Sequence, residues 1–237
     1  MKILTAHQPV YLPWLGLFHK ISLADEFCFF DIAQYQTRDW NNRNYILCDG
    51  NKVLLTVPVL SKNHFDIKIK DVKINNQIDW RRKHWKSIYL AYKKTKYFHK
   101  YSDFFEDLYK REWRELSELN EYILKYLLKI LDININFVKA SDCNFEGYKS
   151  ALVLDMSKKL EADTYIFGEQ GENYADENMF AQNRIKIYFQ NYQHPEYEQY
   201  NAKSFVSYLS VLDLLFNAGA ESKNVILKNN ISKEEIF

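Results

Sequence analysis

Glycine and proline are scarce in this chain, whose 237 residues include six glycines and four prolines. The sequence contains neither G-x-G-x-x-G nor a Walker loop, so the two commonest glycine-rich phosphate-binding loops are absent. It also lacks internal repeats, low-complexity segments and glycine–serine linkers. The length suffices for one sizeable α/β domain or for a core with a large insertion.

Cysteine and long hydrophobic runs are rare as well. The three cysteines are Cys28, Cys48 and Cys143. Their odd number and wide spacing indicate reduced thiols, and no C-x-x-C pair could hold zinc. No signal peptide precedes His7, and no stretch reaches the ~20 apolar residues of a membrane span. We therefore expect a cytoplasmic protein without a membrane span.

A strong charge imbalance is also missing, because the formal net charge is +1 and 47% of the residues are hydrophobic. This balance is typical of a soluble globular protein and argues against a nucleic-acid partner. A small-molecule partner is expected instead, and the sequence leaves open whether the chain forms a homo-oligomer.

The hydrophobic patterns predict an α/β fold with a Rossmann-like parallel sheet of about five strands. A strand over 2–6, a helix over 13–24 and a strand over 27–30 form an initial βαβ unit. Asp49-Gly50 then marks a β-hairpin between 44–48 and 52–59. The alternation over 67–74 predicts a half-exposed strand. Three helices are expected next, over 78–93, 100–113 and 115–131.

The βα pattern then returns and completes the sheet. The remaining strands are expected over 135–138, 164–167 and 185–189, the last as an edge strand; the helices are expected over 148–161, 177–183 and 206–217. Asn217 and Gly219 are plausible C-cap residues of the closing helix. We predict a single domain over 1–237, with the hairpin and helical segment inserted at about 44–131.

The turn after the first strand carries more functional groups than a structural turn needs. Parallel strands place such turns at the carboxyl edge of the sheet, where α/β proteins bind ligands. The candidate site residues of this turn and the following helix are His7, Gln8, Tyr11, Trp14 and His19. His7 and His19 are candidate catalytic residues. The alternative for His7 is a turn histidine that bonds to backbone groups, and the alternative for His19 is a helix-surface or packed histidine. A metal held by both with Asp31 is disfavoured by their spacing, and no cofactor is expected.

An amide-rich segment follows the second strand. Asp31 ends that strand, where an acid commonly binds a ribose or sugar hydroxyl or serves as a cap. Amides suit sugar hydroxyls, an aromatic ring stacks on a pyranose or base, and arginine suits a diphosphate. The substrate-binding candidates here are Asp31, Gln34, Trp40, Asn42, Arg43 and Asn44. A plain polar loop is the alternative.

Further candidates come from the helical insertion and the returning strands. Lys83 and His84 belong to a basic cluster that could bind phosphate or form a solvated face. Ser141 and Glu169 follow strands, and Glu169 is a candidate general base beside His7. His194 and Tyr197 lie after the edge strand and could close the acceptor side of the site.

Motifs along nearly the whole chain resemble the WbqC-like protein family. They are His7-Gln8-Pro9 to His19-Lys20, Trp40-Asn41-Asn42-Arg43-Asn44, Val57-Pro58-Val59, Lys83-His84-Trp85-Lys86, Gly168, His194-Pro195-x-Tyr197-x-Gln199 and Leu209-Ser210 through Gly219. The resemblance implies a role in bacterial surface-polysaccharide (O-antigen, lipopolysaccharide) biosynthesis. It narrows the pathway more than the reaction.

The candidate site residues and the family resemblance together predict a transferase that acts on a nucleotide-activated (amino) sugar, by acyl or aminoacyl transfer. One alternative is a nucleotidyl-transfer or adenylating enzyme, because nucleotidylyltransferases also place histidines on the first βα turn. The other is a non-catalytic protein that binds a glycan precursor. If a histidine carries the proton transfer, activity should fall as the pH drops through ~6.5.

Overall fold

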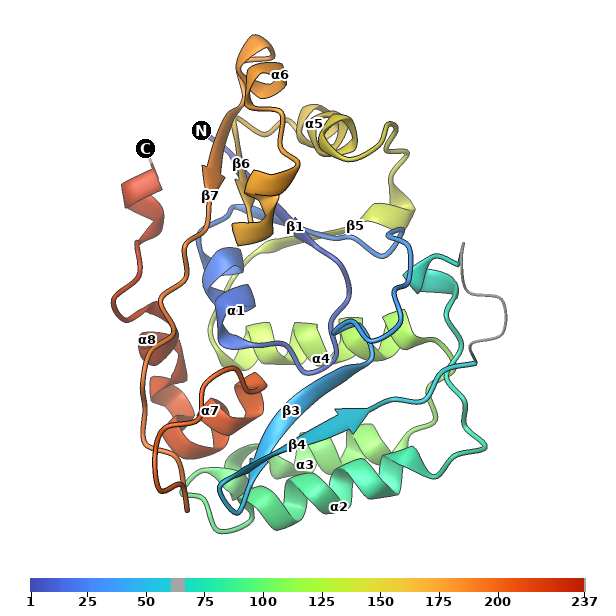
Figure 1. Cartoon of the computed structure of the whole chain (residues 1–237), viewed down its shortest axis with the longest axis vertical. Helices are drawn as coiled ribbons and strands as arrows, with labels where there is room; N and C mark the ends of the chain where they lie inside the picture. The colour runs from blue at the N-terminus through green and yellow to red at the C-terminus, as the bar shows by residue number, and fades with distance from the viewer. Residues whose placement is uncertain (61–66, 237) are drawn as a thin grey trace.

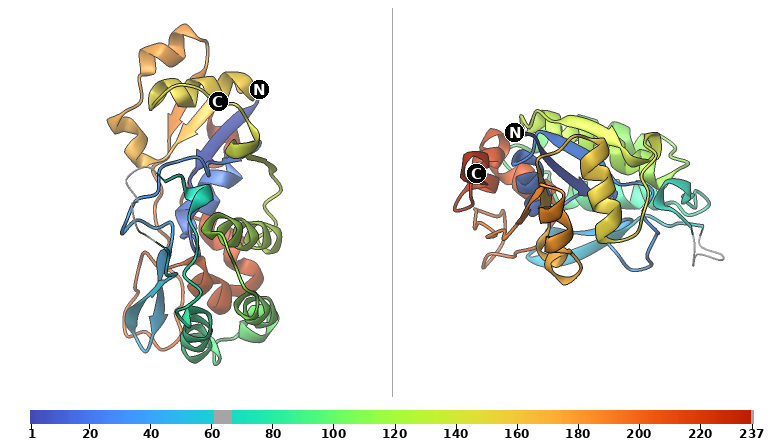
Figure 2. Two further views of the ribbon diagram at one scale, coloured as in Figure 1. Left: turned by 90° about the vertical axis from the view of Figure 1, so that its right-hand side faces the viewer. Right: turned by 90° about the horizontal axis from the view of Figure 1, so that it is seen from above.

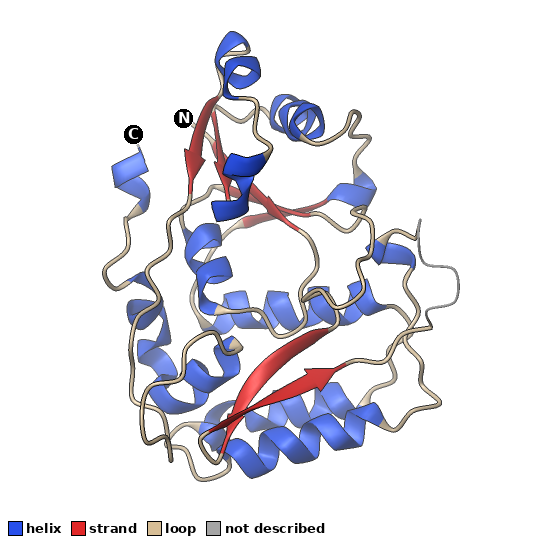
Figure 3. Ribbon diagram, in the orientation of Figure 1, coloured by secondary structure: helices blue, strands red, loops and turns tan. Residues whose placement is uncertain are grey.

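Five parallel strands form the central sheet, in the order β5-β2-β1-β6-β7 (Figures 1 and 3). The structure is a computed structural model that describes residues 1–60 and 67–236. The strands are β1 (Ile3–His7), β2 (Glu26–Phe29), β5 (Asn136–Lys139), β6 (Thr164–Phe167) and β7 (Lys186–Phe189). The predicted α/β class and the parallel sheet of about five strands are confirmed, with β7 at an edge.

Helices cover both faces of this sheet. They are α1 (Leu15–Ser22) on one face and α5 (Ser150–Lys159) and α6 (Glu177–Gln182) on the other. Two closing helices follow: α8 (Ser222–Leu227) packs on α1, and α7 (Val211–Ala218) packs on α8. Leu4, Cys28 and Phe167 face one side and pack with side chains of α5 and α6. Their neighbours in sequence, such as Phe27 and Phe29, face the other side and join the cluster that contains α1. Both faces are therefore buried, as the continuous apolar runs predict.

The hairpin and three helices are inserted between β2 and β5, as predicted. They are β3 (Arg43–Cys48), β4 (Asn51–Thr56), α2 (Trp80–Tyr92), α3 (Phe98–Lys110) and α4 (Leu116–Ile130). The hairpin and the α2–α3 pair form two layers beyond the sheet, at the lower end of the molecule (Figure 2, left). One buried cluster runs from α1 and β2 through all of these elements, so the insertion shares its core with the sheet.

The strand predicted over 67–74 is wrong. The segment contains a 3₁₀ helix, η2 (Ile69–Asp71), flanked by isolated bridges such as Val59 to Ile74. Ile69 and Val72 are both buried, and their spacing of three matches one 3₁₀ turn. The apolar residues of this segment are therefore buried in the same core, although the segment forms no strand that pairs with another.

The closing helix also begins later than predicted. Ser210 caps α7 by accepting a hydrogen bond from the Leu212 N–H, so the preceding residues stay outside the helix. Gly219 ends it at a φ of +60°, as its predicted C-cap role requires. No helix within the described residues is both long and apolar enough to cross a membrane.

Parallel pairing brings the ends of β1, β2, β5 and β6 to one edge of the sheet. His7 pairs with Phe29, and Phe29 pairs with Lys139. Beyond these strand ends, the Ser141 N–H donates to Asp31 Oδ1 at 2.9 Å. Asp31 is 1% exposed, so its carboxylate connects the ends of β2 and β5 inside the fold.

Replacing Asp31 with alanine should lower the free energy of unfolding by about 1–3 kcal/mol, because the part-buried Ser141 N–H loses its charged acceptor. Urea denaturation measures the change. Asp142→Ala, which removes an exposed carboxylate from the same turn, is the matched control and should change stability by less than about 0.5 kcal/mol. Equal stability of the two variants would contradict the structural role of Asp31.

Candidate functional site

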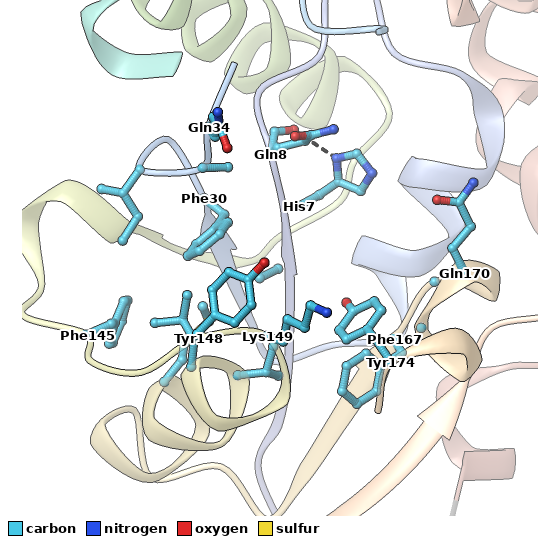
Figure 4. Close-up of a pocket in the computed structure, with 18 of the residues that line it drawn as sticks. His7, Gln8, Phe30, Gln34, Phe145, Tyr148, Lys149, Phe167, Gln170 and Tyr174 are labelled. Atoms are coloured by element: carbon cyan, nitrogen blue, oxygen red, sulfur yellow. Dashed lines mark hydrogen bonds between the residues drawn. The ribbon is translucent and has the colours of Figure 1, made fainter. Parts of the chain in front are cut away.

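A cavity of about 770 Å³ lies at the carboxyl edge of the sheet (Figure 4). Its walls come from the end of β1, residues 30–36 after β2, the loop before α5 with part of α5, and β6 with the turn that follows it. Lys20 of α1 and Lys68 complete the lining. The predicted site residues that line it are His7, Gln8 and Gln34. They come from separate parts of the chain, and the sheet places them together.

Aromatic side chains form much of the cavity wall. Phe30, Phe145, Phe167, Tyr148 and Tyr174 line it. Tyr148 is 77% exposed and Tyr174 is 44% exposed, so both stand at the opening. Such rings offer flat faces for a sugar or a base.

The charges that line the cavity are all of one sign. Lys20, Lys68 and Lys149 contribute to the lining, and no aspartate or glutamate of the described residues does. Lys68 and Lys149 are exposed, whereas Lys20 is 4% exposed at the inner end. A near-neutral protein therefore has a locally cationic site.

His7 is a neutral imidazole with one nitrogen left for a ligand. Its Nδ1 lies 2.8 Å from the Gln8 backbone oxygen, which can only accept, so Nδ1 carries the proton. Nε2 therefore keeps a lone pair. Burial lowers the pKa of His7 to about 3, and the positive charge of Lys20 adds to this effect. The ring edge packs on Trp14, with 5.4 Å between ring centroids.

Lys20 lines the cavity but is not among the site residues predicted from the sequence. It lies on α1, and its ammonium donates to the Ala6 carbonyl at 3.0 Å. Burial lowers its pKa to about 8. A signal was present in the sequence, since Lys20 interrupts an otherwise apolar helix directly after His19. The helical period alone does not predict whether the Lys20 side chain faces the apolar core or the cavity.

Several predicted site residues are held by the protein instead. His19 is buried, its Nε2 donates to the Ile231 carbonyl and its Nδ1 accepts from Gln190, so neither ring nitrogen is left for a substrate. Glu169 is exposed in the turn η4 (Glu169–Asn173) and does not line the cavity. Asp31 and Ser141 bond each other as described above.

The amide-rich segment mainly supports backbone. Asn42 Nδ2 donates to the Val57 carbonyl, and Asn44 Nδ2 donates to the Leu12 carbonyl. Both side chains are buried. Trp40 packs on Tyr45 outside the cavity, and Arg43 is half-buried on the hairpin with its Nε unbonded within the described residues. None of the four lines the cavity.

A buried network accounts for Tyr11 and His84. The Tyr11 hydroxyl contacts both His84 Nδ1 and the Tyr109 hydroxyl, while His84 Nε2 donates to the Thr56 carbonyl. His84 thereby ties α2 to the turn after β1. Lys83, its neighbour, is exposed.

The last two candidates lie in the segment after β7. The Tyr197 hydroxyl donates to Asp213 Oδ2 at 3.0 Å and anchors this segment on α7. His194 Nδ1 donates to the Pro195 carbonyl, and its ring packs between Tyr208 and Phe205. Neither lines the cavity. Within the described ranges, no three His, Cys, Asp or Glu side chains group so that they could hold a metal.

Lys20→Met should raise the free energy of unfolding at pH 7 by about 1–2 kcal/mol, because an ammonium without a counter-charge is costly to bury. The wild type should also gain stability between pH 8 and 10. There the unfolded lysine still holds its proton while the folded lysine, with its pKa at about 8, has released it.

Urea denaturation at pH 7, 8, 9 and 10 tests both statements, and the difference between wild type and Lys20→Met isolates this group. Lys86→Met, at an exposed position on α2, is the control. A lower stability of Lys20→Met at pH 7 would show that the ammonium stabilises the fold.

Comparison with known proteins identifies the family of this chain. The family model described as "WbqC-like protein family" matches residues 8–225. The uncharacterized protein Rv1507c of Mycobacterium tuberculosis is 31% identical over 228 residues, which cover 95% of this chain and 98% of that protein. No solved structure matches the chain significantly. The family match covers the sheet strands after β1, the insertion and most of the closing helices, and the chain therefore belongs to the WbqC-like protein family.

Proposed function

We propose that the protein is a transferase of bacterial surface-polysaccharide biosynthesis that acts on a nucleotide-activated amino sugar. The observation that carries this proposal is the neutral His7, whose free Nε2 borders a cationic cavity that no acidic residue of the described chain lines. Family membership supports the link to polysaccharides but not the reaction.

The cavity suits a ligand of this size and chemistry. Its volume of about 770 Å³ falls within the range of roughly 300–1,000 Å³ of small-molecule sites. The rings of Tyr148 and Tyr174 at the opening suit a base or a pyranose, and the amides of Gln8 and Gln34 at the wall suit hydroxyl groups. The lysines favour the charge of a diphosphate.

Acyl or aminoacyl transfer onto an amino sugar uses these groups without a covalent enzyme intermediate. The amine nitrogen attacks the acyl carbon, the bond from that carbon to its leaving group breaks, and the leaving group departs with the electron pair. His7 Nε2 takes the proton that the amine loses. This requires the neutral form of His7, which its lowered pKa maintains.

The cellular setting belongs to the same proposal. Cys28, Cys48 and Cys143 are free thiols in the structure, which suits a reducing compartment such as the cytoplasm. We keep the single-domain organisation over 1–237 and the possibility of a homo-oligomer as predictions. The partner that we propose for the cavity is a small molecule.

A nucleotide sugar should stabilise the protein against heat. At 100 times the dissociation constant, the free energy of unfolding should rise by ~2.7 kcal/mol. A thermal-shift panel of uridine, thymidine, guanosine and adenosine diphosphate sugars measures this, with free glycans alongside. A shift with free glycans and none with any nucleotide would favour the glycan-binding alternative.

His7→Ala should abolish transfer while the dissociation constant of the stabilising nucleotide sugar changes less than threefold. The wild-type kcat/KM, which reports the free enzyme, should stay level from pH 7 to pH 5, because the pKa of His7 lies at about 3 and not at the ordinary 6.5. Product formation followed by mass spectrometry provides the rate. His99→Ala, at an exposed histidine of α3, is the matched control.

Two outcomes would contradict this role. Equal loss of binding and turnover in His7→Ala would make His7 a ligand-binding group of a non-catalytic protein. An acid limb at pH 6.5 in the wild type would assign the proton transfer to another group.

A further inference from the structure

Lys20 holds a positive charge that the folded protein does not neutralise. Its ammonium has three N–H donors, and one of them donates to the Ala6 carbonyl. Lys20 forms no ion pair with any carboxylate of the described residues, although other buried or half-buried charges do, such as Glu26 with Lys2. Within the described part of the chain, two donors therefore have no acceptor and are available to a ligand.

The titratable groups around Lys20 offer no counter-charge. The cavity brings His7 from β1, Tyr165 from β6, Tyr174 from the following turn, and Lys68 and Lys149 from the two loops. None of these carries a negative charge at neutral pH. The nearest acids along the chain are engaged, since Asp25 pairs with Lys233 and Glu26 pairs with Lys2. Further along, Asp31 accepts from Ser141 and Asp39 accepts from Gln8 at 2.9 Å.

The position of Lys20 in the sheet is also that of a ligand site. The chain passes from β1 to β2 on one side, and later to β6 on the other side of β1. This reversal makes the gap between β1 and β6 the switch point, where doubly wound sheets bind ligands. Lys20 Nζ lies there, bonded to Ala6 of β1, and a Cβ built on Gly168 after β6 would come within 4.0 Å of it.

We propose that Lys20 forms an anion subsite beside His7 at the inner end of the cavity, and that this subsite holds a phosphate or carboxylate group of the substrate. This inference rests on the proposed function and adds the orientation of the substrate. The anionic group lies at the inner end of the cavity, and the sugar or base lies between the aromatic rings at the opening. Lys20 supplies the two free donors, and His7 Nε2 lies beside the bound group.

The buried Lys20 should contribute more to anion affinity than the two exposed lysines. Exposed charges are screened over ~8–10 Å at ordinary ionic strength, so Lys68 and Lys149 mainly attract the ligand. Lys20 is 4% exposed, and water and salt compete with its ligand far less. A bound anion would also offset the charge of Lys20 that disfavours protonation of His7, and so make His7 a stronger base.

The test compares four proteins: wild type, Lys20→Met, the double variant Lys68→Met/Lys149→Met, and Lys86→Met as the control outside the cavity. Calorimetry measures binding of pyrophosphate and of glucuronate, with N-acetylglucosamine as the neutral probe, in 0.05 M and 0.5 M NaCl. Melting curves of the free proteins establish that each variant is folded. The two anions distinguish a phosphate site from a carboxylate site.

Lys20→Met should weaken binding of the preferred anion at least tenfold at both salt concentrations. The double variant should weaken it about threefold at 0.05 M NaCl and not at 0.5 M. An NMR titration of His7 in the wild type should show its pKa rising when the anion is bound. Unchanged anion affinity in folded Lys20→Met, or a larger and salt-resistant loss in the double variant, would overturn the subsite.

This experiment separates the two proposals. Anion binding that depends on Lys20, in a protein that no nucleotide sugar stabilises, would support the subsite and contradict the nucleotide-sugar transferase. Stabilisation by a nucleotide sugar that is equal in wild type and Lys20→Met would support the transferase and contradict the subsite.

Discussion

Parallel hydrogen bonding on both sides of β1 is the constraint on which the rest of the structure depends. β1 pairs with β2 through His7 and with β6 through Thr5, so it occupies the centre of the sheet. Because every strand runs the same way, the turn after each one emerges at the same edge. Residues as distant in the chain as His7 and Gly168 therefore line one cavity. The cavity follows from strand direction rather than from any local motif.

The inserted hairpin and helices complete this arrangement by supporting the turn after β1. That turn lies outside the sheet ladder, so its buried carbonyl groups need other donors. Asn41 donates to the Pro9 carbonyl and Asn44 donates to the Leu12 carbonyl, while Asn120 of α4 donates to the Asn41 carbonyl. The density of amides that suggested a sugar-binding loop is thus largely a set of backbone supports, which hold His7 and Gln8 in place.

Charge sets the inner end of the cavity apart from the rest of the core. Elsewhere, buried polar groups such as Asp31, His19 and Asp213 bond to protein partners. Among the residues that the structure describes, the Lys20 ammonium bonds only to the Ala6 carbonyl, and none of the acids lines the cavity. Burying such a charge lowers stability, and natural proteins accept this cost where a ligand supplies the missing partner. The core elsewhere is apolar and continuous enough to tolerate it.

The sequence by itself determined the strands, most helices, the Asp49-Gly50 hairpin and the edge at which His7 lies. These depend on local hydrophobic periods and turn residues, which act over a few positions. It misread 67–74, where apolar residues at a spacing of three served a 3₁₀ turn. Only the tertiary structure decided which polar side chains stay available. Both ring nitrogens of His19 form hydrogen bonds with Gln190 and Ile231, which lie more than 170 residues away in the chain, whereas its neighbour Lys20 lines the cavity. A helix turns by about 100° per residue, so which of two adjacent side chains meets the cavity depends on how α1 packs against the sheet.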